Sequence, residues 1–108
     1  MKKYIVMGNY TAKAFQGFMK DPSQDRAATA TQLSEAVGGK MKSFDIVRGA
    51  YDFVGMITGD VGFEATAAVK LAVESTGTIT NFTILEKIDM NKTAELAAKA
   101  MAGYKPAG

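Results

Sequence analysis

The chain has 108 residues, of which 47% are hydrophobic and 22% charged, and its 13 basic and 11 acidic side chains leave a formal charge of +2. This composition is typical of one soluble globular domain, here spanning residues 1–108. The sequence contains no Cys, His or Trp, which excludes thiol nucleophiles, Ser-His-Asp triads and zinc or haem bound through those side chains. Its apolar runs are too short for a signal peptide or a membrane span, so we expect a cytoplasmic protein without membrane contacts.

Residues with strand preference open the chain, and two helices follow. β-branched and aromatic side chains predict a strand over Lys2–Asn9. Thr11 is placed to cap a short helix over Ala12–Met19, and Asp21-Pro22 to start a second one. This second helix carries apolar residues at helical spacing and ends at Gly38-Gly39, because a left-handed helix terminus favours glycine.

The first unit of strand, helix and strand ends with the next predicted strand, and the rest of the chain repeats this order before a final helix. These predicted elements are strands over Lys40–Val47 and Tyr51–Thr58, a helix over Val61–Ser75 that Asp60 caps and Gly77 ends, a strand over Thr78–Ile88, and a final helix over about 91–102. Strand, helix and strand used twice indicate a split βαβ arrangement. Right-handed crossovers then predict a four-stranded antiparallel sheet with both long helices on one face.

Apolar residues alternate on both faces of the predicted sheet. In the third strand Phe53 and Ile57 point away from Val54 and Met56, and in the fourth strand we expect Phe82 and Ile84 on the side opposite to Ile79 and Leu85. The two helices can cover only one face. An exposed apolar patch of this size favours a second subunit, so we expect a homodimer in which sheet packs on sheet.

Three segments together resemble the GYD domain family: Tyr4-Ile5-Val6-Met7-Gly8-Asn9-Tyr10-Thr11, Gly38-Gly39-Lys40-Met41-Lys42 and Gly49-Ala50-Tyr51-Asp52-Phe53-Val54. The resemblance covers roughly residues 3–88 and departs from the family after the third strand, at Thr58-Gly59-Asp60-Val61-Gly62. It implies an α+β, ferredoxin-like βαββαβ fold of the dimeric α/β-barrel kind, in a bacterial cytoplasm. The wider barrel superfamily includes monooxygenases, haem enzymes and isomerases, so the fold does not choose a reaction.

Asp52 and Tyr51 are the candidate catalytic residues, because they directly follow the Gly49 turn at the mouth of the predicted cleft. Asp52 can act as a general base whose pKa is raised by apolar neighbours, with a tyrosine hydroxyl as partner. In the structural alternative Asp52 accepts hydrogen bonds from turn amides and pins the hairpin, while Tyr51 packs in the core.

The candidate ligand-binding residues fall into three groups. Asn9 and Tyr10 lie where a strand leads into a helix, so they can meet a ligand or simply organise the helix start. Arg48 can attract an anion or belong to a solvated strand edge. The remaining candidates are apolar side chains that would line a barrel between two sheets or act as plain core: Met7, Met56 and Phe82.

These observations favour a homo-oligomeric binding or regulatory module for a small apolar or weakly anionic ligand, held in a cleft between helices and sheet or in a barrel between two sheets. The alternatives are a cofactor-independent isomerase or monooxygenase of small cyclic substrates that uses Asp52 as base, and a structural oligomer in which the C-terminal helix swaps onto a neighbour. Catalysis is left open by the sequence. We expect no metal and no cofactor, and the small net charge without a basic run argues against nucleic acid.

Overall fold

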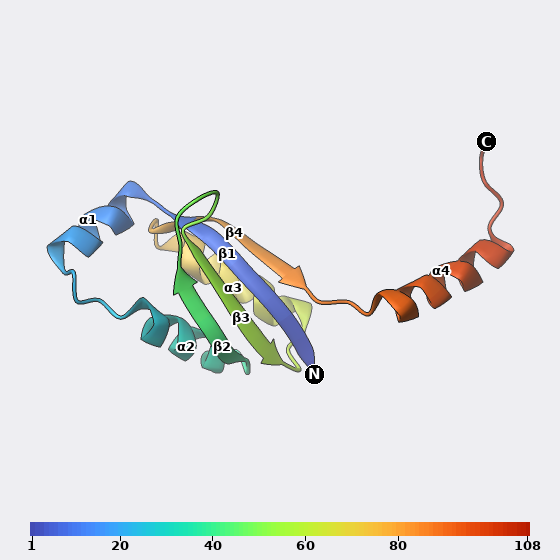
Figure 1. Ribbon diagram of the computed structural model, residues 1–108, viewed down its shortest axis with the longest axis horizontal. Coiled ribbons are helices and arrows are strands. Elements are labelled where there is room, and N and C mark those ends of the chain that lie inside the picture. Colours follow the sequence, from blue (N-terminus) through green and yellow to red (C-terminus); the bar gives the residue numbers. More distant parts are fainter.

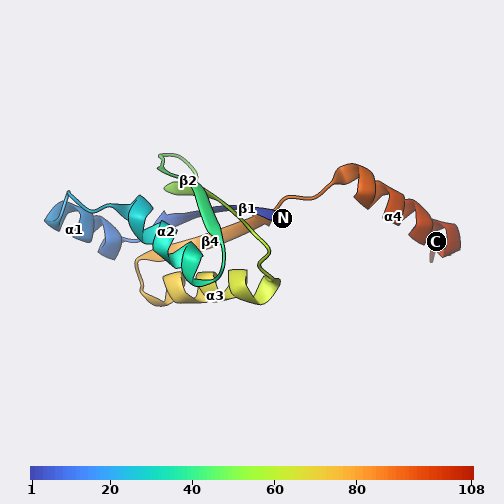
Figure 2. The same ribbon diagram turned by 90° about the horizontal axis from the view of Figure 1, so that it is seen from below.

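The computed structural model describes all 108 residues. Its elements are β1 (Lys2–Tyr10), α1 (Ala12–Lys20), α2 (Arg26–Ala36), β2 (Lys40–Ile46), β3 (Phe53–Gly59), α3 (Phe63–Ser75), β4 (Ile79–Glu86) and α4 (Met90–Gly103). The strands form one antiparallel sheet in the order β2-β3-β1-β4 (Figure 1). Helices α2 and α3 lie on the same side of this sheet, and the other side carries no helix (Figure 2). The predicted split βαβ arrangement is therefore confirmed.

Two helices begin later than their sequence signals predict. Asp21 ends α1 and its carboxylate binds Ser23, whereas Asp25 caps α2 by accepting a hydrogen bond from the Ala28 amide at 3.0 Å. Helix α3 likewise starts after Gly62, not after Asp60. In both places several residues with capping or turn preference follow one another, and the carboxylates of Asp21 and Asp60 bind Ser23 and the Met1 amino group instead of a helix start.

Bulges in two strands change which side chains face the helices. An extra residue of β4 lies opposite the Met7 to Asn9 stretch of β1, and Asn81 adopts a φ of 54° there. Because of this bulge, Ile79 packs against the same core as Phe82, so the predicted placement of Ile79 on the opposite face is wrong. A second bulge in β2 directs both Met41 and Phe44 toward the helices, three residues apart.

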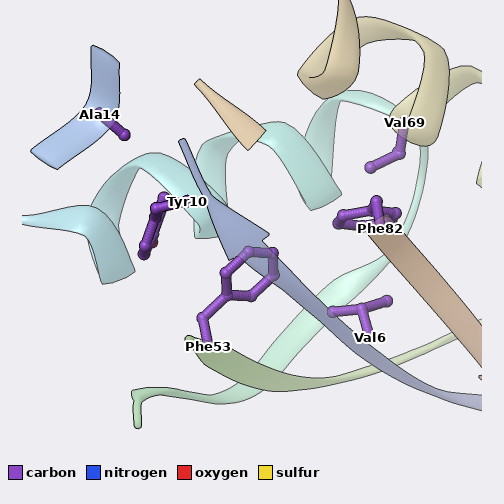
Figure 3. Close-up of a cluster of buried hydrophobic side chains, with 6 residues drawn as sticks. All are labelled: Val6, Tyr10, Ala14, Phe53, Val69 and Phe82. Atoms are coloured by element: carbon purple, nitrogen blue, oxygen red, sulfur yellow. The ribbon is translucent and has the colours of Figure 1, made fainter. Parts of the chain in front are cut away.

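The core is small and lies between the sheet and its two helices. Only 11 of the 108 residues are buried, which leaves large surfaces of the sheet and helices open. The largest buried cluster combines residues of β1, β3, β4, α1 and α3: Val6, Tyr10, Ala14, Phe53, Val69 and Phe82 (Figure 3).

The uncovered sheet face presents a continuous apolar area. Ile5 on the central strand β1 pairs with Met56 of β3 and with Leu85 of β4, and Met7 pairs with Val54 in the next row. Paired residues on adjacent strands project to the same side, so these five side chains form one patch. We call them the open-face patch.

Two helices extend beyond the sheet. Helix α1 lies past one end, and α4 projects from the end of β4 with every residue exposed (Figure 1). The Cα radius of gyration is accordingly 17.7 Å, compared with about 13 Å for a compact chain of this length. No helix combines the length and hydropathy needed to cross a membrane.

Candidate ligand cavity

A cavity of about 310 Å³ lies between the sheet and helices α2 and α3. Thirteen of its eighteen lining residues are hydrophobic, so it favours an apolar occupant. Leu33 contributes from α2 and Val69 from α3. The sheet side is built from aromatic residues of all four strands or their ends: Tyr10, Phe44, Phe53 and Phe82.

Phe53 is the centre of this aromatic floor. Its ring centroid lies 5.3 Å from that of Tyr10, 5.7 Å from Phe44 and 6.0 Å from Phe82. The Phe53 ring lies close over Gly8, where a β-carbon would meet the ring at 2.8 Å. The glycine in the first strand therefore makes room for the aromatic ring of Phe53, which Figure 3 shows beside the ribbon of β1.

Two side chains of α3 hold the backbone of Phe82 in β4. Helix α3 supplies both partners: the Phe82 amide donates to Glu74 Oε2 at 2.9 Å, and Lys70 Nζ donates to the Phe82 carbonyl oxygen at 2.7 Å. Glu74 and Lys70 are themselves 3.5 Å apart. Because β4 is an edge strand and Phe82 has no partner in the pairing with β1, these side chains satisfy backbone groups that no strand reaches.

Tyr10 and Arg26 bring polar groups to the apolar cavity. Burial raises the pKa of the Tyr10 phenol, the nearby Arg26 guanidinium lowers it in part, and Asp52 adds a smaller upward effect. The phenol therefore stays protonated at neutral pH and can donate a hydrogen bond. Arg26 begins α2 and is half-buried between the cavity and a smaller depression that Asp52 and Tyr10 also line.

Asp52 anchors the loop between β2 and β3 to the central strand. Its Oδ2 atom accepts hydrogen bonds from the Tyr10 amide at 2.8 Å and from Asn9 Nδ2 at 3.3 Å. The Asp52 amide donates to the Gly8 carbonyl oxygen, and Asn81 Nδ2 donates to Asn9 Oδ1 at 3.1 Å. This network joins the loop, the end of β1 and the β4 bulge, and it orients Tyr10 toward the helices.

The structure brings some of the predicted site residues together and separates others. Asn9, Tyr10 and Asp52 are in direct contact, and Tyr10 and Phe82 share the cavity. Phe82 does not face the same side as Met7 and Met56, which belong to the open-face patch, so the expected common lining of these three residues is wrong. The physical reason is the alternation of side chains along each strand.

The loop residues Tyr51 and Arg48 lie outside the cavity. Tyr51 precedes β3, which begins at Phe53, so its predicted place within the strand is wrong. Arg48 is exposed and makes no hydrogen bond or ion pair through its side chain. The cation that does reach the cavity is Arg26, which is not among the residues predicted from the sequence. Its position four residues before Ala30 continues the helical spacing of the buried side of α2, and that spacing was the available signal.

The chain holds no group of three or more acidic side chains placed to bind a metal ion. The cavity itself is an apolar pocket whose polar side chains are one phenol, one guanidinium and the hydroxyl groups of Ser and Thr residues. None of these groups is a strong base at neutral pH, so their roles are to donate hydrogen bonds and to attract negative charge.

This geometry belongs to the ferredoxin-like class of α+β proteins, and a solved structure shares it. The "crystal structure of FFRP-DM1" is similar to this chain with a TM-score of 0.51 and 14% sequence identity, over 82% of this chain and 100% of that one. The model of the GYD domain matches residues 4–97. The chain therefore belongs to the GYD domain family, as its sequence resemblance predicts. Comparison with curated proteins finds no significant match.

Proposed function

We propose that the protein binds a small apolar or weakly anionic molecule in the cavity between its sheet and helices α2 and α3. The observation that carries this proposal is the unfilled apolar volume of about 310 Å³ above an aromatic floor. A protein interior is normally packed to the density of an organic crystal, so an opening of this size next to the core favours an occupant. Its volume lies at the lower end of the usual range of ligand sites, about 300–1,000 Å³.

The fluorescent probe N-phenyl-1-naphthylamine, which is neutral and apolar, tests this proposal. We expect its emission to rise on binding, and Ala30→Phe to weaken binding about tenfold or more, because Ala30 lines the cavity. The matched control is Ala28→Phe, which adds the same ring at an exposed position of α2 outside the cavity. Absence of binding, or equal weakening by both variants, would contradict the proposal.

A homodimer is the second part of the proposal, with the open-face patch covered by a second copy of the chain. The patch is apolar, lies opposite the helices and carries Leu85 with 48% of its surface exposed. Sheet-on-sheet packing would bury it in a symmetric interface. A bacterial cytoplasm is the location that accompanies this proposal, and the family resemblance supports it.

Native mass spectrometry tests the dimer. We expect a mass of two chains for the native protein and of one chain for Met56→Glu, which puts a charge into the patch. Leu71→Glu is the matched control, because Leu71 lies on α3 with 75% of its surface exposed and should leave the dimer intact. A monomeric native protein, or a dimer unaffected by Met56→Glu, would rule out this interface.

A cofactor-independent isomerase or monooxygenase is the second candidate function, because Asp52 shares a depression with Tyr10 and Arg26 beside the cavity. Turnover of a cavity ligand that Asp52→Asn abolishes while binding persists would favour this enzyme. The hydrogen bonds that occupy Asp52 favour a role in positioning instead. A structural oligomer joined by α4 is supported by the full exposure of that helix. This alternative requires that removal of residues 90–108 change the number of chains in the assembly.

A further inference from the structure

The aromatic floor favours a flat ligand. The Phe53 ring centroid lies 5.7 Å from that of Phe44 and 6.0 Å from that of Phe82. The rings of Phe44 and Phe53 are stacked at an interplanar angle of 23°. Aromatic rings gain interaction energy from offset-stacked or edge-to-face contacts with another ring. A planar ring placed on this floor would meet such faces and edges, whereas a branched aliphatic molecule would not use them.

Arg26 is the charged side chain of the cavity lining, and no carboxylate neutralises it. All three ion pairs of the structure involve other residues, and the side-chain hydrogen bond of Arg26 goes to the neutral Gln24 Oε1 at 3.4 Å. Asp52 lies in the adjoining depression, but its Oδ2 is engaged by Tyr10 and Asn9. The guanidinium therefore keeps its capacity to bind a planar anion with two parallel hydrogen bonds.

The other polar groups of the cavity lining are neutral, whereas Asp21 and Asp52 line the adjoining depression together with Arg26. Thr29 lies one turn further along α2, and Thr76 and Thr78 line the rim from the end of α3, where their hydroxyl oxygens are 2.6 Å apart. The Tyr10 phenol is also neutral at physiological pH, since its ordinary pKa is 10.0 and burial raises it further. A ligand carboxylate inside the cavity would thus meet one cation and several hydroxyl groups, and no carboxylate belongs to the cavity lining itself.

We propose that the cavity selects aromatic carboxylic acids of one or two rings, with the ring against Phe53 and the carboxylate held by Arg26. This inference rests on the proposed binding function and specifies its ligand class. The anion-binding cation in this proposal is Arg26, which lines the cavity, and not Arg48, which the sequence favours.

Isothermal titration calorimetry with two ligands of equal shape tests the proposal. 2-Naphthoate carries a carboxylate, and 2-naphthamide replaces it with a neutral amide. We expect the native protein to prefer naphthoate by about tenfold or more, as for a charge-assisted hydrogen bond. Arg26→Gln should abolish this preference and leave naphthamide affinity within about twofold, whereas Arg48→Gln should leave both affinities unchanged.

The variant Arg26→Lys provides a second test, because lysine keeps the positive charge but cannot form two parallel hydrogen bonds to a carboxylate. We expect it to retain part of the preference for naphthoate. A preference that survives in Arg26→Gln, or disappears in Arg48→Gln, would overturn the assignment. If N-phenyl-1-naphthylamine and naphthamide bind but naphthoate gains nothing, the proposed binding function stands and the acid selectivity fails. If none of the three compounds binds, the binding function itself fails.

Discussion

Removal of the Asp52 carboxylate should destabilise the fold by an amount that its hydrogen bonds define. Its Oδ2 atom accepts from the Tyr10 amide at 2.8 Å and from Asn9 at 3.3 Å. A hydrogen bond to a charged group contributes about 1.5–3 kcal/mol, and the longer contact to the half-buried Asn9 at 3.3 Å should add little. We therefore expect Asp52→Ala to lower the free energy of unfolding by about 2–3 kcal/mol, and Asp52→Asn by about 1 kcal/mol, since the amide oxygen still accepts from Tyr10.

Urea denaturation followed by circular dichroism measures these differences. At about 4 °C or more per kcal/mol, the melting temperature of Asp52→Ala should fall by about 8–12 °C. Asp45→Ala serves as the control, because Asp45 is an exposed acid of β2 whose carboxylate makes no hydrogen bond or ion pair. If Asp52→Ala is as stable as this control, Asp52 does not anchor the loop, and the reasoning from the hydrogen-bond network is refuted.

Three further perturbations follow from local contacts. Gly8→Ala should destabilise the chain by about 1–3 kcal/mol in urea denaturation, because its β-carbon would meet the Phe53 ring at 2.8 Å. The control Gly17→Ala in α1 should be neutral or stabilising. Equal effects of the two substitutions would argue against close packing of Phe53 on Gly8. A backbone amide of β4 is the main cause that lowers the pKa of Glu74 below 4.5, so its contribution to stability is present above that value and lost as the pH falls through the lower folded pKa. The melting-temperature advantage over Glu74→Gln should therefore shrink in acid, and an advantage independent of pH would contradict this. Removal of residues 90–108 should change the melting temperature by less than about 2 °C, because α4 is fully exposed; a larger drop would mean that α4 packs on the assembly.

The order of the elements could be predicted because local signals mark it clearly. Glycines with positive φ follow both long helices, at Gly38 and Gly77, and β-branched residues fill the strands. The helix starts were less predictable, since Asp21 and Asp25 carry the same capping chemistry, and in the structure Asp21 binds Ser23 while Asp25 caps α2.

The cavity depends on long-range features that alternation along a strand does not reveal. The bulge at Asn81 turns Ile79 toward the helices, and simple counting places it on the other side. Asn9, Tyr10 and Asp52 could be singled out because all lie beside turns in sequence. Their contact across 42 or 43 residues follows from the pairing of β1 with β3, which no local pattern contains.

The positions of the methionines allow the binding site to be located directly. Met41 lines the cavity, whereas Met7 and Met56 belong to the open-face patch on the other side of the sheet. Nuclear magnetic resonance of protein labelled with ¹³C at the methionine methyl groups, titrated with N-phenyl-1-naphthylamine, distinguishes the two faces. We expect the Met41 methyl signal to shift while those of Met7 and Met56 stay in place. Shifts of Met7 and Met56 without a shift of Met41 would place the ligand on the open sheet face and contradict the proposed cavity.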